Sequence, residues 1–508
     1  MNERKPLAEL KAVDWDMIVV GGGITGAGVV REAVRRGCKV LLVEQADFAW
    51  GTSSRSSKMV HGGLRYIAAG DIRLTWHSLV ERERLLREAP GLVTRLGYWF
   101  AHYEKTFPGP WVFGFLLSVY DLLARVRDHR YVARDKFLEQ MPGYREQGLR
   151  GGSRYTDALV DDARLVLRVL DESMDEGACV RNYTRVEAPL LHAGEVIGAR
   201  LRDLESGEAV DVSCRTLINA TGAWADRLRS SIAASKRVRP LRGSHLVVAS
   251  ERLPVREATI FMHPDDGRAV FIYPWQGRTV IGTTDLDHHD DLDEEAHISR
   301  QEFDYLLRAA NRQFPAVALV DGDVIATFSG VRPIVSSGRG LHPSQEKRDH
   351  SVFSEHGMIT VTGGKLTTFR QIALDVLRAA APRLGIVVRD RGEAVFAPAP
   401  QDRLGARFGR TAQRIHELPA PQEQALLPGL DYSLAEMRWS LRHEQVVHLD
   451  DLLLRRTRIG LLCRQGGEEF LQLIAPLCRD ELGWSEERWQ AEVKRYQQIW
   501  QRFYSLPA

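Results

Sequence analysis

The chain has 508 residues, which is enough for several domains with sizeable hydrophobic cores. Its formal net charge is only +2, so the strongly basic surface of a nucleic-acid-binding protein is excluded and no nucleic acid is expected as a partner. The five cysteines are scattered without metal-ligand spacing, so we expect neither a disulfide framework nor a metal site, and a reducing, cytoplasmic setting is favoured.

The first predicted elements are a buried strand, a glycine-rich turn and a helix. After an apolar, β-branched run, Gly21, Gly23 and Gly26 follow at the spacing of a dinucleotide-binding fingerprint. The first glycine permits a tight turn, the second lets a pyrophosphate approach the backbone, and the third lets helix and strand pack closely. The helix that starts with Ile24 and Thr25 offers free N–H groups and a partial positive charge to the phosphates.

A second apolar strand, residues 40–43, ends in Glu44 about 20 positions further on. A carboxylate there would accept hydrogen bonds from a ribose diol and would repel a 2′-phosphate, which favours FAD or NAD over NADP. Gln45 follows directly and is included in the predicted cofactor site.

A loop of small hydroxylated residues comes next, and it runs into a His-Gly-Gly sequence. Such residues could let a cofactor pass close to the backbone, whereas the alternative is a flexible surface loop. The His-Gly-Gly sequence favours tight packing over disorder. The residues predicted to contact the cofactor here are Thr52, Ser53, Ser54, Ser57, Lys58, His61, Gly62, Gly63 and Leu64.

An apolar helical stretch covers residues 111–126. It is shorter than the 18 residues expected of a spanning helix and contains Asp121. Two interpretations stay open: a buried or half-buried helix, or a helix that lies in a membrane interface with Arg127 and Arg130 at the headgroups.

Two later turns are predicted to meet the same cofactor. The first turn contains Thr221, Gly222 and Trp224 and follows a strand over residues 215–219. A separate strand leads to Gly330, which is also predicted to contact the cofactor. The second turn, residues 363–368, opens a helix whose N–H groups would stabilise negative charge on a flavin ring. Its predicted cofactor contacts are Gly364, Lys365, Leu366 and Thr367.

The order of elements predicts an α/β fold with a Rossmann-type FAD-binding domain, an interleaved antiparallel-sheet substrate domain and an all-α C-terminal domain. Alternating strands between residues 243 and 285 indicate the second sheet. We expect an oxidoreductase region over residues 1–388, of which 14–95, 150–240 and 323–388 bind FAD and 241–322 form the substrate sheet. The all-α domain is assigned to residues 389–508; it begins with a stretch that contains a Pro/Ala linker at 397–400, and the helical pattern follows that linker.

An ordered series of motifs carries a resemblance to a known family. The motifs are Gly21-x-Gly23-x-x-Gly26, residues 52–58, 61–66, 160–164, 243–245, 282–285, 329–333 and 363–368, and the C-terminal run 453–460. Together they resemble the FAD-dependent glycerol-3-phosphate dehydrogenases, in the glycine/D-amino-acid oxidase-like flavoprotein superfamily. The resemblance covers nearly the whole chain.

The resemblance implies that FAD oxidises sn-glycerol 3-phosphate to dihydroxyacetone phosphate by hydride transfer from C2 to flavin N5. It implies that the electrons pass to a membrane quinone, although related members use dioxygen. It also leaves open a homodimer and a peripheral contact of a cytoplasmic protein with the inner face of the plasma membrane.

The predicted substrate site combines basic, hydroxyl and histidine side chains. A small phosphate dianion needs arginine or lysine donors, and by resemblance the substrate-binding residues are Arg65, Tyr66, Thr283, Arg332, Arg348 and Lys365. The hydroxyl proton must also leave, and His245 is the first candidate for the base. Arg332 and Lys365 complete the predicted catalytic group, but the residues alone do not settle which is the base.

Three other functions stay open at this point. The first is a same-fold oxidase that reduces dioxygen, and the second is a flavoenzyme for another small 2-hydroxy acid. The third is a non-catalytic FAD-binding interaction protein that uses its C-terminal helices for docking.

Overall fold

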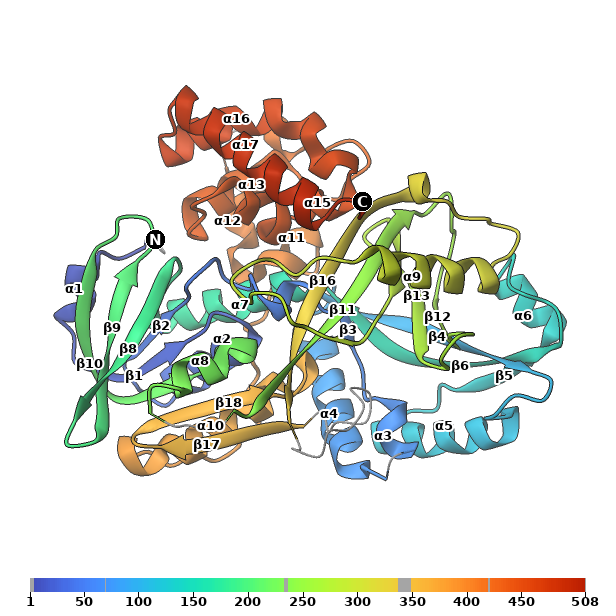
Figure 1. Ribbon diagram of the computed structural model, residues 1–508, viewed down its shortest axis with the longest axis horizontal. Helices are drawn as coiled ribbons and strands as arrows, with labels where there is room; N and C mark the ends of the chain where they lie inside the picture. The colour runs from blue at the N-terminus through green and yellow to red at the C-terminus, as the bar shows by residue number, and fades with distance from the viewer. Residues whose placement is uncertain (1–3, 69, 233–235, 337–348, 419–420, 508) are drawn as a thin grey trace.

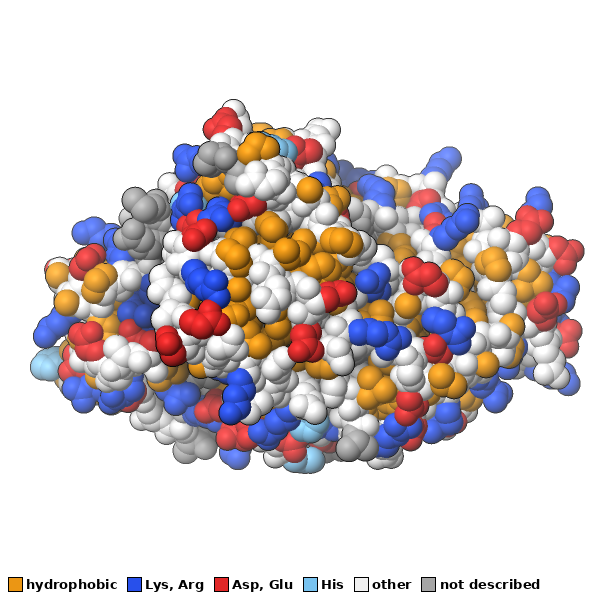
Figure 2. Space-filling model, turned by 90° about the horizontal axis from the view of Figure 1, so that it is seen from above, with side chains coloured by type: hydrophobic (Ala, Val, Ile, Leu, Met, Phe, Trp, Pro, Cys, Tyr) orange, Lys and Arg blue, Asp and Glu red, His pale blue; other side chains and the backbone are white. Residues whose placement is uncertain are grey.

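The computed structural model describes residues 4–68, 70–232, 236–336, 349–418 and 421–507. Two sheets lie next to each other, and the helices of the C-terminal region sit above the place where they meet (Figure 1). Seen from above, charged side chains of both signs surround an apolar area near the centre of that face (Figure 2), so no single sign of charge dominates it.

The first sheet is the predicted Rossmann-type sheet, with strand order β17-β18-β10-β1-β2-β7. Its parallel strands are β1 (Trp15–Val20), β2 (Val40–Val43), β7 (Cys179–Arg181), β10 (Ala209–Asn219) and β18 (Met358–Gly363), with β17 (His350–Glu355) antiparallel at the edge. Strands β1 and β2 are almost wholly buried, as expected for a parallel sheet covered on both faces.

Different elements cover the two faces of this sheet. One face packs against the mutually contacting helices α2 (Ile24–Val34), α7 (Asp162–Asp175) and α10 (Phe369–Leu384). The other face shares a core with α1 (Leu7–Lys11), β8 (Thr184–His192) and β9 (Glu195–Asp203). The carboxyl ends of β1, β2 and β10 therefore stay available for a ligand.

The second sheet has the order β15-β11-β14-β13-β12-β4-β6-β3, with β16 beside β11 and β5 beside β6. Its central strands are β11 (Val238–Ala249), β12 (Ala258–Met262), β13 (Ala269–Trp275), β14 (Arg278–Gly282), β15 (Leu286–Asp287) and β16 (Val324–Val335). The remaining strands are β3 (Met59–Val60), β4 (Val93–Tyr103), β5 (Arg130–Ala133) and β6 (Leu149–Val160).

This sheet is wider than the range 241–322 expected for it. Strands β3, β6 and β16, which fall almost wholly in ranges expected to bind FAD, pair with it instead, and so do β4 and β5, which lie mostly in residues 96–149 and were assigned to neither part. The physical reason is that hydrophobic alternation predicts a strand but not its partner, and the pairing of β4 with β12 joins segments about 160 residues apart. The interleaving itself is confirmed.

The remaining helices before the C-terminal domain connect and flank the strands of the two sheets. They are η1 (Thr52–Ser54), α3 (Leu64–Ala68), α4 (Ile72–Glu88), α5 (Pro110–Ala124), α6 (Arg134–Gln140), η2 (Gly222–Trp224), α8 (Ala225–Arg229), α9 (Arg300–Gln313), η3 (Asp321–Asp323) and η5 (Leu366–Thr368). Helix α5 corresponds to the apolar stretch 111–126. Its inner face, with Leu117 and Tyr120, is buried, while Trp111, Phe115 and Leu122 are largely exposed.

The all-α C-terminal domain is confirmed. It contains α11 (Arg403–Phe408), η6 (Gly409–Thr411), α12 (Ala412–His416), η7 (Pro421–Gln424), α13 (Leu434–His443), α14 (Leu449–Asp451), the π-helical η8 (Leu452–Arg456), α15 (Ile459–Leu462), η9 (Arg464–Phe470), α16 (Leu471–Leu482) and α17 (Glu486–Phe503). Its core is continuous with one face of the second sheet. The chain end returns to that sheet, where Thr327 N donates to Tyr504 O at 2.7 Å. Within the described residues, none of these helices or the earlier ones is long and apolar enough to span a membrane.

Candidate cofactor and substrate site

A cavity of about 350 Å³ opens at the carboxyl ends of β1, β2 and β10. This is the place where open α/β sheets bind ligands. Most of the predicted cofactor residues line it, namely Gly21, Gly23, Ile24, Thr25, Glu44, Gln45, Thr52, Ser53, Thr221, Gly222, Trp224, Gly364, Lys365 and Leu366. Segments far apart in the chain thus line one cavity.

The glycine turn at Gly21 and Gly26 has the geometry that a tight turn and close packing of helix on strand require. Gly21 has φ +113°, and a Cβ there would lie 2.6 Å from Ala220 O. A Cβ on Gly26 would lie 1.9 Å from Gly21 O, so this glycine serves the close packing of α2 on the turn rather than the cavity wall. Only glycine fits at these two positions without a shift of the backbone.

The Glu44 carboxylate sits at the end of β2 and faces the cavity. It accepts hydrogen bonds from Gly22 N at 2.7 Å and from Ala46 N at 2.9 Å. Burial raises the pKa of Glu44, although these backbone donors oppose the shift. The donors also hold the carboxylate still, so its remaining lone pairs could receive a ribose diol.

The hydroxylated loop is ordered by specific hydrogen bonds. Ser53 Oγ accepts from Ile24 N at 3.0 Å, and Thr52 Oγ1 donates to Val331 O at 2.5 Å. Ser54 is buried, and Ser57 Oγ lies 2.9 Å from His245 Nε2. The loop therefore connects the glycine turn with the second sheet and is not a free surface segment.

Lys58 has a different position from the one expected of a cofactor contact. Its side chain is fully buried, and its ammonium lies 2.9 Å from Asp162 Oδ1 and donates to Ser54 O at 3.0 Å. Burial lowers the pKa of Lys58 to about 8, although Asp162 opposes the shift. The reason for the difference is a partner more than a hundred residues away, which makes Lys58 an internal support of the loop.

The segment from His61 to Leu64 packs tightly beside the site and is not part of the cavity lining, and the same holds for Thr367. Gly62 N donates to the Tyr120 hydroxyl at 2.9 Å. Gly63 has φ +84°, and a Cβ there would lie 2.2 Å from the Tyr66 ring. That ring lies under the Lys365 ammonium, 3.7 Å from the ring centroid, so these two predicted substrate residues are in contact.

The two other predicted basic residues are not described by side-chain contacts. Arg65 belongs to α3, but its side chain lies outside the described part of the structure. Arg348 lies outside the described residues altogether.

His245 occupies a buried position on β11 opposite Gly282 of β14. Its ring stacks on Phe328 at 4.5 Å, and a Cβ on Gly282 would lie 2.2 Å from it. Burial, together with the positive charges of Arg332 and Lys58, lowers the pKa of His245 well below its ordinary value. The imidazole is therefore neutral near pH 7. Within the described residues its Nδ1 is buried without a hydrogen-bond partner.

Arg332 and Thr283 lie close to this histidine. Arg332, on β16, donates to Thr283 Oγ1 at 2.9 Å and to Asp285 Oδ1 at 3.0 Å. A Cβ on Gly243 would lie 2.3 Å from the guanidinium, so the glycine makes room for the arginine. Gly330 plays a similar part, because a Cβ there would lie 2.6 Å from Arg55 O.

The sequence did not indicate two further parts of the cavity wall. One is the start of β8, with Thr184, Arg185, Val186 and Glu187, and the other lies on and after α8, with Arg227, Leu228 and Ser231. The start of β8 lies beside Glu44, where Thr184 N donates to Glu44 O at 2.7 Å, and no sequence motif indicated this neighbour.

The donor set of the cavity fits FAD. It offers a glycine turn at the start of α2, a held carboxylate at the end of β2 and a second glycine turn before α10. These three groups are of the kinds that bind a pyrophosphate, a ribose diol and a flavin ring.

Comparisons with known proteins agree with this geometry. The family description "FAD dependent oxidoreductase" matches residues 16–370, and "C-terminal domain of alpha-glycerophosphate oxidase" matches residues 383–489. The aerobic glycerol-3-phosphate dehydrogenase of Staphylococcus epidermidis is 31% identical over 95% of this chain and 93% of its own length. The glycerol-3-phosphate dehydrogenase of Mycobacterium leprae is 33% identical over 95% of this chain and 87% of its own.

A solved structure extends the similarity to three dimensions. The glycerol-3-phosphate dehydrogenase from Bacillus halodurans complexed with FAD is 26% identical, with a TM-score of 0.79 over 97% of this chain and 96% of that one. Its bound cofactor and the matched family both identify FAD as the cofactor of this fold. The chain therefore belongs to the FAD-dependent oxidoreductases, and within them to the glycerol-3-phosphate dehydrogenase/oxidase family.

Proposed function

We propose that this protein oxidises sn-glycerol 3-phosphate to dihydroxyacetone phosphate and passes the electrons to a membrane quinone. One observation carries the proposal. Gly364 and Lys365 line the cofactor cavity, and the neutral His245 lies near Arg332, with its Thr283 and Asp285 partners, on the adjoining sheet. The names of the relatives support glycerol 3-phosphate as the substrate.

The substrate phosphate needs cationic donors, which this end of the site can supply. Lys365 donates to Ser78 Oγ at 3.2 Å and lies over the Tyr66 ring, so its ammonium is held in one place. Arg332 is held by Asp285 and Thr283. We assign Lys365, Tyr66, Arg332 and Thr283 to substrate binding, together with the predicted Arg65 and Arg348.

Oxidation at C2 removes a hydride from carbon and a proton from the hydroxyl group. FAD, when bound, accepts the hydride at N5. His245 is neutral because burial and two nearby cations lower its pKa, so it can receive the hydroxyl proton. Arg332 would stabilise the oxygen as that proton departs. The amides at the start of η5 and α10 would stabilise negative charge on the flavin ring.

A membrane contact fits the proposed acceptor. Helix α5 presents Trp111, Phe115 and Leu122 to solvent with 91%, 69% and 76% of their surface exposed. The neighbouring helix α4 adds Ile72 and Trp76. Apolar side chains on one face of a helix, followed by arginines, are typical of a segment that lies in a membrane interface.

Turnover with two acceptors tests the proposal against its alternatives. With glycerol 3-phosphate, we expect reduction of a quinone analogue to be much faster than peroxide formation from dioxygen. Fast peroxide formation with slow quinone reduction would instead identify an oxidase, to which the matched C-terminal domain description also points. If neither acceptor is reduced, the enzymatic proposal is wrong and a non-catalytic FAD-binding protein remains.

A further inference from the structure

The loop of residues 45–58, here called the cofactor loop, supplies a large part of the cavity wall. Gln45, Trp50, Gly51, Thr52, Ser53 and Ser56 all line the cavity. Apart from the single turn η1, the loop has no regular structure that could fix its path. Ala49 and Lys58 have φ values of +62° and +55°, which non-glycine residues adopt only where the surroundings hold them.

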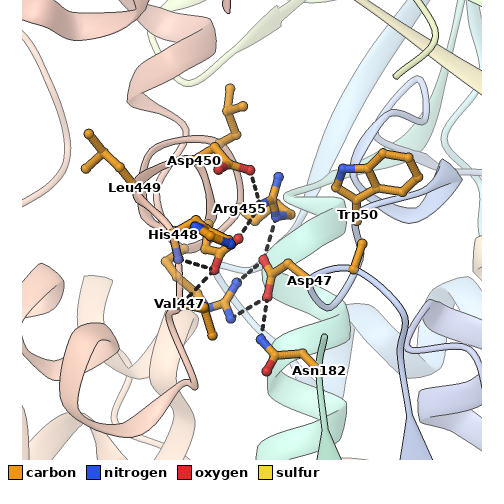
Figure 3. Close-up of polar contacts among 12 residues, drawn as sticks. Asp47, Trp50, Asn182, Val447, His448, Leu449, Asp450 and Arg455 are labelled. Carbon is orange, nitrogen blue, oxygen red and sulfur yellow. Dashed lines mark hydrogen bonds and ion pairs between the residues drawn. The ribbon is translucent and has the colours of Figure 1, made fainter. Parts of the chain in front are cut away.

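The first point that holds the loop is Asp47, which is completely buried. Arg456 of η8 binds both of its oxygens, at 2.5 and 2.8 Å, and Arg455 Nε lies 2.5 Å from Oδ2. Asn182 donates to Oδ1 at 3.2 Å, and Figure 3 shows Asn182 and Arg455 on two sides of the Asp47 carboxylate. Burial opposes ionisation of Asp47, but the two arginines outweigh it and lower its pKa.

The second and third points lie near the other end of the loop. Arg458 donates to Ser54 O at 3.0 Å and pairs with Asp162, the same carboxylate that binds Lys58. The Tyr504 hydroxyl accepts from Arg55 Nη2 at 3.0 Å. Both Arg458 and Tyr504 belong to the C-terminal region, about 400 residues or more from the loop.

The loop in turn supports the glycine-rich turn that faces the pyrophosphate. Ala49 N donates to Gly22 O at 3.0 Å, two residues after Asp47. Ser53 Oγ accepts from Ile24 N at 3.0 Å, next to Ser54. Displacement of Asp47 or of Ser54 would therefore shift the glycine-rich turn that faces FAD.

We propose that the C-terminal domain positions the cofactor loop for FAD through Arg455, Arg456, Arg458 and Tyr504. These are positioning residues, because they contact the loop and not the cavity. The inference goes beyond the proposed function, since it holds for any substrate and any electron acceptor. It assigns to the C-terminal domain a part in forming the cofactor site.

The chain contains a matched control for this proposal. Arg168 of α7 is only 3% exposed and donates to Gly405 O and Ala406 O at 3.1 Å, so it also joins the FAD-binding domain to the C-terminal domain. Its hydrogen bonds go to Gly405 and Ala406 and its ion pair to Glu172, and none of these residues belongs to the cofactor loop. Removing it disturbs the same interface without releasing the loop.

The experiment compares Arg456→Met with Arg168→Met in the full-length protein. FAD is removed, and its rebinding to the apoprotein is measured by flavin fluorescence, alongside hydrogen exchange of peptides from residues 45–58. For Arg456→Met we expect the FAD dissociation constant to rise at least about tenfold and exchange in the loop to increase. For Arg168→Met we expect a change within about twofold, even if the two variants melt at similarly lowered temperatures.

Two further variants keep the test decisive. Arg456→Lys keeps the charge but not both bonds to Asp47, so it should bind FAD with intermediate affinity. Asp47→Asn tests the same contact if Arg456→Met fails to fold, and it should also weaken FAD binding. Unchanged FAD affinity and loop exchange in Arg456→Met or Asp47→Asn would overturn the proposal. So would equal weakening by Arg168→Met.

Discussion

The Nε2 atom of His245 lies 2.9 Å from the hydroxyl oxygen of Ser57. This contact joins β11 of the second sheet to the cofactor loop that follows β2 of the first. Because the histidine is buried and close to Arg332 and Lys58, its pKa is lowered well below the ordinary value. The base proposed for the reaction is thus held neutral by the same packing that unites the two sheets.

Replacing this histidine should slow the chemical step more than it affects binding. For His245→Asn we expect kcat to fall by about 10²- to 10⁴-fold, the usual contribution of a general base, with the FAD absorbance spectrum retained. Steady-state kinetics with glycerol 3-phosphate measures this. A variant with near-normal kcat would show that another group takes the proton.

The depressed pKa of His245 also predicts a dependence of stability on acid. A histidine whose folded pKa lies below its unfolded value costs stability as the pH falls below the unfolded value. The wild type should therefore lose more stability between pH 6.5 and pH 5 than His245→Asn does. Denaturant titrations at the two pH values compare them, and equal losses would contradict the buried, neutral histidine.

Arg332 is expected to act on the substrate and not on the fold. Its guanidinium is about one-fifth exposed and is held by Asp285 and Thr283. Arg332→Lys keeps one charge but loses the planar pair of donors, so we expect kcat/KM to fall about 10- to 100-fold, the equivalent of one or two charge-assisted hydrogen bonds. The melting temperature should stay close to that of the wild type. Unchanged kcat/KM would remove Arg332 from the site.

Alanine substitutions at two glycines can distinguish an effect on cofactor binding from a general effect of backbone strain. A Cβ on Gly26 would lie 1.9 Å from Gly21 O, whereas Gly37, with φ +78°, has open space around it. We expect Gly26→Ala to abolish or strongly weaken FAD binding by moving the turn. Gly37→Ala should cost only about 1 kcal/mol of stability and leave FAD binding intact. Retained FAD affinity in Gly26→Ala would contradict the assigned role of the turn.

His448 gives the contact between the domains a measurable pH dependence. Burial lowers its pKa, but hydrogen bonds to Glu205 of the FAD-binding domain and Glu492 of α17 outweigh this and raise it to about 9. Since the folded pKa exceeds the unfolded value, this stabilisation is complete below about pH 6.5 and is lost as the pH rises through about 9.

The stability difference between the wild type and His448→Gln should thus shrink between these pH values, by on the order of 1–3 kcal/mol. Denaturant unfolding at pH 6 and pH 9.5 measures it. A difference that is independent of pH would show that the histidine is not charged in the folded protein.

The exposed face of α5 predicts membrane binding that depends on apolar side chains. Trp111→Ser combined with Phe115→Ser should reduce co-sedimentation with vesicles that contain anionic lipids, while turnover with a water-soluble quinone analogue is retained. Leu191→Ser is the control, because Leu191 is about half exposed on β8 of the other sheet. Equal vesicle binding by the wild type, the Trp111/Phe115 double variant and Leu191→Ser would show that α5 does not contact the membrane.

Local sequence motifs predicted residues around the cofactor cavity better than they predicted the buried contacts that hold those residues in place. The turn at Gly21 and the acid at Glu44 could be found because both lie within one strand–helix–strand unit, where spacing alone carries the geometry. The burial of Lys58 could not be found, because its partner Asp162 is 104 residues away. For the same reason Asp47 carried no signal, since Arg455 and Arg456 approach it from the C-terminal domain.

The division into sheets shows the same limit. The alternation in β4 and β6 is visible in the sequence, but their membership of the second sheet depends on register with distant strands. Helix α5 is half buried, as the first of its two interpretations expected, and the membrane-interface interpretation stays a prediction.

Anaerobic reduction of the bound flavin tests the central claim most directly. The holoprotein is mixed without oxygen with sn-glycerol 3-phosphate and, separately, with other small 2-hydroxy compounds, and the flavin absorbance is followed. We predict that glycerol 3-phosphate bleaches the flavin at the lowest concentration and that Arg332→Met loses this response. No bleaching by glycerol 3-phosphate, or preferential bleaching by a compound without a phosphate, would contradict the account.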